Sequence, residues 1–299
     1  MRVAIIGHIP YDNYTLADGS TYTGFGGIFY GASALSELVK PGGSVVFISR
    51  IGDNTLSRVS AVASSFGMKL NIDAVPGDGW TVNAVYVNGE ERREHLTGGV
   101  PAWTADELIP LVEGCEGVIL NMVTGYEMEL QEFVTFASHV PFLHLDFHSL
   151  ALGRDHAGLR YPRLNSDAVD WCRHADIVQM NRKELESVFP GIDPKSAVKA
   201  ISDWGPQWVA ATEGSSGVYL AAGNTVWHLP ADNPTETPVD PTGCGDAFGA
   251  GLLVGALHGK SILDAAIDAQ RLARRNADFK NIPPVGAYAG FVTDGGRHR

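Results

Sequence analysis

Short apolar runs alternate with helix-like stretches along most of the chain, and this alternation restricts the fold more than any other feature of the sequence. The runs typical of strands buried on both faces are RVAIIGH, SVVFISRIG, GVILNMV, PFLHLDF and ADIVQMN. The helix-like stretches include GASALSELVK, TLSRVSAVASSFG and GDAFGAGLLVGALHG. Such alternation predicts an α/β fold, with a mostly parallel central sheet covered by helices on both faces.

One segment follows a different period. Residues Trp80 to His95 alternate apolar and polar side chains, and Asn88-Gly89 is a typical hairpin turn. Alternation of this kind belongs to a sheet with one solvated face. Together with residues Tyr11 to Thr23, it predicts a small antiparallel β flap, or lid, built from about 11–23 and 80–95 within a single domain of residues 1–299. An edge hairpin without a function is an equally good interpretation, and a flap with one apolar face could also pair with its copy in a homodimer.

Composition and charge argue against several classes of protein. The chain has 299 residues, of which 44% are hydrophobic, so it can bury a sizeable core. Its net charge of −12 disfavours nucleic acid or an anionic membrane as a partner, since both attract clustered Lys and Arg. The three cysteines are far apart and form no CxxC pair, which argues against a zinc site or a disulfide framework. Without a long apolar segment or a leader-like start, we expect a cytoplasmic protein.

The stretch DPTGCGDAFGAG, residues 240–251, concentrates four glycines before and within a helix. Gly243 and Gly245 allow a tight turn, and amides at a helix start have no internal partners, so the stretch predicts an anion hole. Asp246, in the first helical turn, is either a capping residue or a general base that accepts the proton of an attacking hydroxyl. A carboxylate with an ordinary pKa of ~4 is an adequate base for phosphoryl transfer.

This stretch closely resembles the C-terminal signature of the ribokinase-like (PfkB) carbohydrate kinases, roughly D-T-x-G-A-G-D-x-F. Pro241 stands at its second position, and Cys244 stands where Ala is usual. Further segments resemble family motifs in the expected order and extend the resemblance over essentially the whole chain. They are GHIPYD, the di-glycine segment GFGGIFYGASALSEL, the N-x-x-E segment QMNRKELESVF and the nucleotide turn TEGSSGVYL.

The resemblance implies an ATP-dependent kinase that phosphorylates a hydroxyl of a small sugar, polyol or nucleoside. It implies that Asp246 is the base, with the amides of Gly243, Cys244 and Gly245 around the transferred group. ATP would be bound by Asn181, Thr212, Gly214, Gly217, Thr242 and Asn276. The acceptor would be bound by Asp12, Gly26, Gly27 and Asp146. Mg²⁺ would be held by Glu184 and Asn181 through waters, and a monovalent cation is suggested near Asp240 and Thr242.

Each of these residues also has a plain structural interpretation. Asn181 and Glu184 could form a capping box at a helix start, Asn276 could be a surface helix residue, and Asp12 could serve a turn. Cys244 is most simply a small apolar residue, although a helix start could lower its pKa and make it reactive. The remaining small residues of GAGLLVGA most simply allow close helix packing.

Two departures from the ribokinase-type pattern bear on the identity of the acceptor. Gly31 stands where ribokinase-type relatives have Asn, and GG-x-x-Y-x-A resembles members that act on inositol or nucleosides, which puts ribose in doubt. Few basic residues accompany the acceptor segments, so a phosphorylated sugar is less favoured, although Arg92 and Arg93 keep it open.

Two other classes of protein remain as alternatives: a sugar- or nucleotide-binding regulator with the same fold and no turnover, and a nicotinamide-dependent enzyme.

Overall fold

The computed structural model describes residues 1–15, 19–88, 91–232 and 240–290, with the side chains of residues 86–88, 91 and 92 outside that description. Gly89 of the expected hairpin turn and the Arg92 side chain therefore lie outside the described residues. None of the helices in these ranges combines the length and the apolar character that spanning a bilayer requires.

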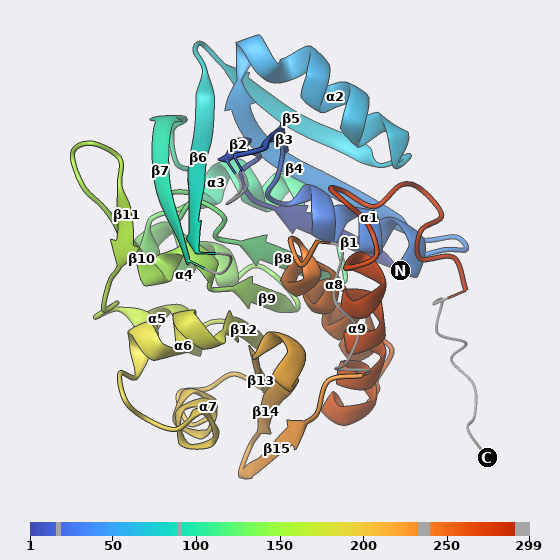
Figure 1. Ribbon diagram of the computed structural model, residues 1–299. Helices are drawn as coiled ribbons and strands as arrows, with labels where there is room; N and C mark the ends of the chain where they lie inside the picture. Colours follow the sequence, from blue (N-terminus) through green and yellow to red (C-terminus); the bar gives the residue numbers. More distant parts are fainter. Residues whose placement is uncertain (16–18, 89–90, 233–239, 291–299) are drawn as a thin grey trace.

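A nine-stranded sheet forms the centre of the molecule, in the order β15-β14-β13-β12-β9-β8-β1-β4-β5 (Figure 1). Its strands are β1 (Arg2–Ile6), β4 (Ser44–Gly52), β5 (Lys69–Val75), β8 (Gly117–Asn121), β9 (Leu143–Asp146), β12 (Ile177–Asn181), β13 (Trp208–Thr212), β14 (Val218–Ala222) and β15 (Thr225–Leu229). All neighbours from β13 to β5 are parallel, and β14 and β15 add an antiparallel edge. The predicted mostly parallel sheet is confirmed.

Helices cover both faces of this sheet because successive strand residues point to opposite sides. In β1, Val3 and Ile5 belong to one apolar core, and Ala4 and Ile6 belong to another. The first core holds α1 (Phe29–Leu38), α2 (Leu56–Ser65) and α8 (Cys244–Leu257), with α9 (Ile262–Asn276) packed on α8. The second holds α3 (Ala105–Leu108), α4 (Leu130–Ala137), α5 (Ala168–Arg173), α6 (Arg182–Val188) and α7 (Pro194–Ser202).

Glycines let α9 lie close against α8. A Cβ on Gly251 would lie 2.8 Å from the Cα of Ala269, and a Cβ on Gly255 would lie 2.5 Å from the Cβ of Ala265. The small residues of this helix therefore serve helix packing, as the sequence predicts.

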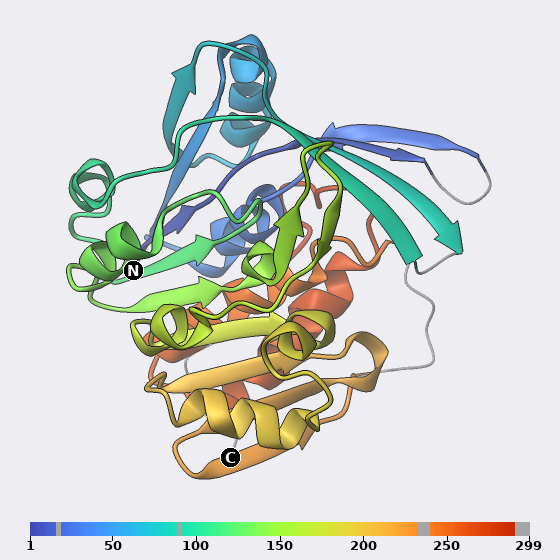
Figure 2. The same cartoon turned by 90° about the vertical axis from the view of Figure 1, so that its left-hand side faces the viewer.

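A second, four-stranded sheet projects from the body (Figure 2). We call it the lid sheet; it consists of β2 (Tyr11–Thr15), β3 (Thr21–Phe25), β6 (Gly79–Asn88) and β7 (Glu91–Gly99), in the order β3-β2-β6-β7. It is a mixed sheet and not wholly antiparallel, because β2 pairs with β6 in parallel. Both strands leave the body from parallel strands of the main sheet, β1 and β5, so they run in the same direction.

A hairpin that the sequence did not predict meets the lid sheet at β7. It consists of β10 (Leu152–Arg154) and β11 (Arg160–Pro162), and it follows the short 3₁₀ helix His148–Ala151. The Leu96 N–H of β7 donates to the Gly158 carbonyl at 2.8 Å. The lid sheet is thus tied to the body at this edge.

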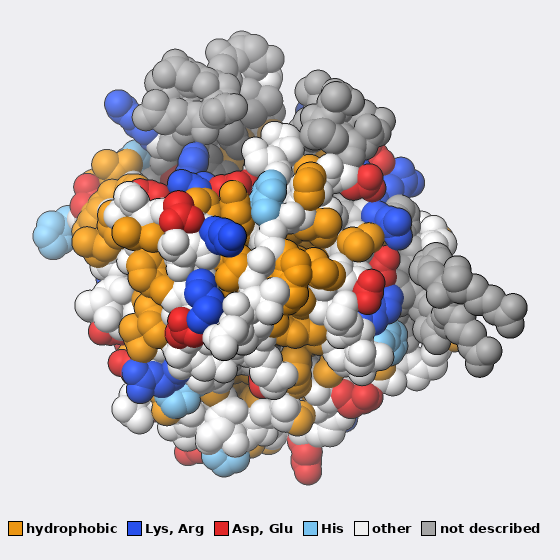
Figure 3. All heavy atoms as spheres, turned by 90° about the horizontal axis from the view of Figure 1, so that it is seen from below, with side chains coloured by type: hydrophobic (Ala, Val, Ile, Leu, Met, Phe, Trp, Pro, Cys, Tyr) orange, Lys and Arg blue, Asp and Glu red, His pale blue; other side chains and the backbone are white. Residues whose placement is uncertain are grey.

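Charges of both signs are interspersed on the face shown in Figure 3, where Lys and Arg lie among Asp and Glu. The described residues of this face do not form a basic patch. The expectation that nucleic acid is not a partner stays a prediction.

Candidate active site

The glycine-rich loop enters α8 at the position that the sequence predicts. Gly243 precedes the helix with φ +79°, and a Cβ there would lie 2.1 Å from Cδ1 of the Tyr30 ring. Only glycine satisfies both the left-handed backbone and this close contact. The Cys244 N–H donates to the Pro241 carbonyl at 3.2 Å. Of the three amides expected around an anion, this one is engaged in the turn, so the amides of Gly243 and Gly245 are the better candidates.

Two further contacts hold the loop. The Thr242 N–H donates to Oδ1 of Asp240 at 2.9 Å, and the Asn276 amide donates to the Thr242 carbonyl at 2.7 Å. Asn276 is fully buried, and its Oδ1 accepts the Tyr288 hydroxyl at 2.9 Å. It is therefore neither a surface residue nor a lining residue of the neighbouring cavity, and it supports the loop from beneath. The monovalent cation near Asp240 and Thr242 stays a prediction.

Asp246 lies in the first turn of α8 and is half-buried. Its Oδ1 accepts a hydrogen bond from Nδ2 of Asn121, the last residue of β8, at 2.6 Å. Burial raises the pKa of Asp246 to about 7, although its own backbone N–H and Asn121 act in the opposite direction. The ordinary pKa of ~4 assumed from the sequence is thus wrong here, because the motif does not show how deeply the carboxyl is buried.

Asp146 at the end of β9 and Glu184 in α6 lie near Asp246, within the range of its charge. Burial, then the charges of Glu184 and Asp246, raise the pKa of Asp146 well above its ordinary value. Burial also raises the pKa of Glu184 to about 7, and Asp246 adds to this effect. Three carboxyl groups in a region of low dielectric favour protonation or a nearby cation.

The described residues contain no cluster of three or more His, Cys, Asp or Glu side chains that could ligate a metal directly. The carboxyl groups nonetheless suit Mg²⁺, which prefers oxygen ligands and keeps several of its waters. Asn181 and Glu184 form the capping box that the sequence allows. The Glu184 N–H donates to Oδ1 of Asn181 at 3.0 Å, and the Asn181 N–H donates to Oε2 of Glu184 at 2.8 Å.

A cavity of about 220 Å³ lies against the glycine loop. It brings together the predicted nucleotide residues Thr212, Gly214 and Gly217 with Cys244 and Gly245. Apolar side chains form much of its wall, namely Val218, Ala231, Phe248 and Ala273. The polar side chains of Asp232, Gln270 and Arg274 also line it. The cavity therefore offers space for a flat apolar ring beside a place for phosphate.

The turn that borders this cavity requires glycine at Gly217, whose φ is +106° and whose Cβ would lie 2.1 Å from the Leu229 carbonyl oxygen. Burial raises the pKa of Cys244 to about 11, and Asp240 and Asp246 add to this effect. The thiol thus stays protonated near neutral pH, so the structure supports its role as a small apolar residue and not as a reactive nucleophile.

Asp12 lies on β2 of the lid sheet and is buried beside the di-glycine segment. A Cβ on Gly26 would lie 2.1 Å from Oδ2 of Asp12. Gly27 has φ +64°, and a Cβ there would lie 2.2 Å from the His8 carbonyl oxygen. Burial, then the charges of Asp12 and Asp240, raise the pKa of Tyr22 to about 12. Asp12 and the start of the glycine loop therefore both lie within reach of this tyrosine.

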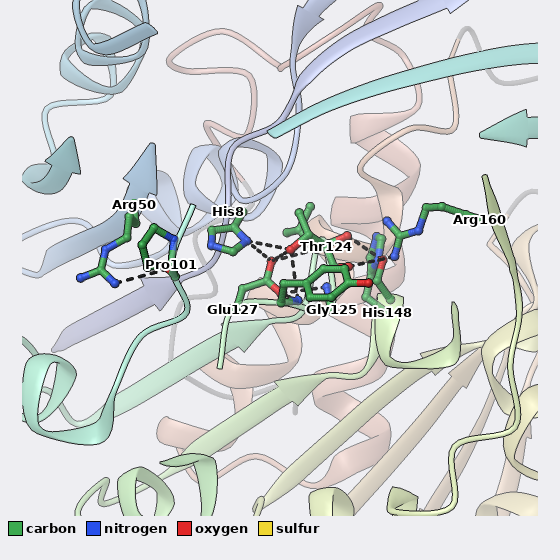
Figure 4. Close-up of polar contacts among 11 residues, drawn as sticks. His8, Arg50, Pro101, Thr124, Gly125, Glu127, His148 and Arg160 are labelled. Carbon is green, nitrogen blue, oxygen red and sulfur yellow. Dashed lines mark hydrogen bonds and ion pairs between the residues drawn. The ribbon is translucent and has the colours of Figure 1, made fainter. Parts of the chain in front are cut away.

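A buried polar cluster that sequence reasoning missed joins the body to the lid sheet (Figure 4). The His8 Nδ1 lies 2.7 Å from Oγ1 of Thr124 and 3.1 Å from Oε1 of Glu127. Burial opposes ionisation of Glu127, but His8 and backbone N–H groups outweigh it, so the pKa of Glu127 is lowered. Arg160 of β11 donates to the Thr124 carbonyl at 2.9 Å and pairs with Glu94 of β7 at 3.4 Å.

Comparison with known proteins agrees with this geometry. Residues 156–277 match the model of the pfkB family of carbohydrate kinases. A cytidine kinase of Thermococcus kodakarensis is 23% identical over 266 residues, which are 88% of this chain and 91% of that protein. The ribokinase of Bacillus subtilis is 33% identical over 130 residues, which are 44% of this chain and 40% of that protein.

Solved structures share the whole fold. A pyrophosphate-dependent kinase in the ribokinase family, in complex with sulfate, superposes with a TM-score of 0.82 at 20% identity and covers 95% of this chain and 98% of its own. The ribokinase of Thermotoga maritima gives 0.74 at 18% identity over 97% and 98%. The fold is that of the ribokinase-like kinases, and the family match and the kinase-named relatives support a carbohydrate or nucleoside kinase. Residues 156–277 of this chain therefore resemble the pfkB family of carbohydrate kinases.

Proposed function

We propose that this kinase transfers the γ-phosphoryl group of ATP to a hydroxyl of a small sugar, polyol or nucleoside. The observation that carries the proposal is the position of Asp246, which lies in the first turn of α8 directly after Cys244 and Gly245, two residues that line the cavity. Asp12, Gly26 and Gly27 would bind the acceptor under the lid sheet. Asp146, which lies near Asp246, would line the same site.

In the proposed reaction, Asp246 accepts the proton of the acceptor hydroxyl while the hydroxyl oxygen bonds to the γ-phosphorus. The bond from that phosphorus to the β,γ-bridging oxygen breaks, and ADP leaves. Amides of Gly243 and Gly245 at the helix start face the charge of the transferred group, and such fixed dipoles need no reorganisation. A carboxylate of ordinary pKa is an adequate base for this reaction, and the raised pKa of Asp246 makes it a stronger base than that.

Glu184 and Asn181, with Asp146 nearby, would hold Mg²⁺ through water molecules. When bound, the ion supplies positive charge that offsets the charges of the donor phosphates. The same charge would favour the deprotonated forms of the three neighbouring carboxyl groups.

ATP and pyrophosphate are the two donors to distinguish, because the structural relatives include pyrophosphate-dependent kinases. The apolar wall of the cavity beside the loop supports a nucleotide, since pyrophosphate has no ring to place against Val218, Phe248 and Ala273. Pyrophosphate use would instead require only the loop and the acidic cluster.

The test combines one variant with two donors. Purified protein is assayed with ATP and with pyrophosphate across pentoses, hexoses, inositols and nucleosides. We expect transfer from ATP, and we expect Asp246→Asn to lower kcat at least ~1000-fold while ATP still binds. Asp106→Asn, an exposed carboxylate distant in the sequence, is the control. Substantial activity in Asp246→Asn would reject the base, and ligand binding without turnover on any acceptor would favour the regulator.

A further inference from the structure

Three side chains from adjacent strands form one row beneath the start of α8. In the strand register, Asn121 of β8 is paired with Asp146 of β9, and Asp146 is paired with Gln179 of β12. Paired residues point to the same face of a sheet, and here that face carries α8. Asn121 is 2% exposed and Gln179 is 3% exposed. Two buried amides therefore flank Asp146, whose pKa is raised in part by the charge of Asp246.

Each amide donates to a different part of the first turn of α8. Nδ2 of Asn121 donates to Oδ1 of Asp246 at 2.6 Å, and Nε2 of Gln179 donates to the Gly245 carbonyl at 2.8 Å. The orientation of both amides follows from their partners, because a carbonyl and a carboxylate only accept hydrogen bonds. Burying an amide costs free energy unless it is hydrogen-bonded, and these two bonds offset part of that cost.

The Gln179 bond also reaches Asp246 through the peptide that links Gly245 to Asp246. This peptide is planar, so fixing its carbonyl oxygen also fixes the direction of its N–H. That N–H belongs to Asp246, and it bonds to the carboxylate of the same residue and lowers its pKa. Asn121 thus holds the carboxylate directly, and Gln179 holds it through the backbone.

The helix leaves room for this arrangement at Gly249. A Cβ there would lie 2.9 Å from Oε1 of Gln179 and 3.0 Å from Cε1 of His144. Any larger residue at this position would displace Gln179 from the Gly245 carbonyl.

We propose that Asn121 and Gln179 are positioning residues for phosphoryl transfer, which orient the Asp246 carboxylate through the two hydrogen bonds at the start of α8. Asn121 occupies Oδ1, so Oδ2 is the oxygen that meets the acceptor hydroxyl. This inference deepens the proposed function and rests on it for the role of Asp246 as the base.

The experiment measures the protonation of Asp246 directly. Protein labelled with ¹³C at the aspartate carboxyl carbon is titrated by NMR, and the Asp246 signal is assigned from its loss in Asp246→Asn. In Asn121→Leu, which keeps the branched shape of the side chain and removes the donor, we expect the Asp246 midpoint to rise by about one pH unit or more. In Gln179→Met we expect a smaller rise in the same direction.

Matched controls come from the same three strands, two residues earlier, where the side chains point to the same face of the sheet as Asn121 and Gln179. Ile119 and Ile177 are the register partners of His144, and Ile119→Val and Ile177→Val should leave the midpoint unchanged. If Asn121→Leu does not fold, Asn121→Ala removes the donor with a smaller side chain. A wild-type midpoint in a folded Asn121 variant, or an equal shift in the controls, would overturn the proposal.

A kinetic arm separates positioning from stability. The assay uses any acceptor that the wild type phosphorylates. In Asn121→Leu, the acidic limb of the kcat/KM profile should move to higher pH by as much as the NMR midpoint of Asp246. The acceptor KM at pH 9 should change little. If no acceptor is turned over, the proposed function fails, and the NMR midpoints still decide whether the two amides control Asp246.

Discussion

Single residues in this molecule carry a conflict between stability and chemistry. Asp146, Glu184 and Asp246 all have raised pKa values because they are buried, and nearby carboxylates add to the effect for Asp146 and Glu184. A protein can retain such groups at a cost to stability when they serve a reaction. The conflict gives stability a pH dependence whose sign is opposite to that of an ordinary paired carboxylate.

The sign follows from proton counting. The ordinary pKa of these groups is about 4, and the folded-state pKa of Asp246 is about 7, so between those values the folded protein binds more protons than the unfolded chain. Stability from this group is therefore lost as pH rises through that window. We expect Asp246→Asn to melt a few degrees above the wild type at pH 8, and at the same temperature near pH 4, by calorimetry. No difference at pH 8, or an equal gain in Asp106→Asn, would contradict this.

At the scale of elements, helix α8 combines the site and the packing of the C-terminal helices. Its first turn holds Asp246, whereas Gly251 and Gly255 further along allow the contact with α9. The small residues of α8 thus shape the site where the helix begins and allow the contact with α9 further along.

Gly251→Ala tests the packing role. Alanine is the better helix former by about 1 kcal/mol, but its Cβ would lie 2.8 Å from the Cα of Ala269, which is backbone and cannot move aside cheaply. We expect a net loss of about 1–3 kcal/mol in the free energy of unfolding, measured by urea denaturation. A variant as stable as the wild type would show that the two helices separate easily.

The sequence predicted those elements whose cause is local. Buried strands, the glycine turn at Gly243 and the capping box of Asn181 and Glu184 each follow from a few neighbouring residues. It did not predict Asn121 as a partner of Asp246, because 125 positions separate them and only strand order brings them together. A polar residue at the carboxyl end of an apolar strand, as in GVILN, was the available signal.

At the scale of the whole molecule, the lid sheet is fixed to the body by several distant segments. Trp80 of β6 stacks on Tyr126 with ring centroids 5.3 Å apart, and Arg160 joins Glu94 of the lid sheet to the Thr124 carbonyl of the body. A lid held in this way would exclude water, which otherwise competes with the acceptor for the phosphoryl group. A homodimer through the lid sheet stays a prediction.

Arg160→Met tests this attachment. We expect several-fold more ATP hydrolysis without acceptor phosphorylation, because the lid sheet loses one of its ties to the body and admits water more often. The measurement compares ADP release with phosphorylated product. Arg173→Met is the matched control, since Arg173 is an exposed arginine that pairs with Asp170 at 3.2 Å. Unchanged coupling of the two products in Arg160→Met would show that the lid does not depend on this contact.

The residues proposed for the acceptor and for the donor come largely from different parts of the chain. Asp12, Gly26 and Gly27 come from the first thirty codons, whereas the cavity beside the loop is built from residues 212 to 274. The family match, residues 156–277, coincides with the second part. With the proposed roles, the acceptor could change through substitutions in the early segments and at Asp146, while the part of the chain that would bind the donor stays the same.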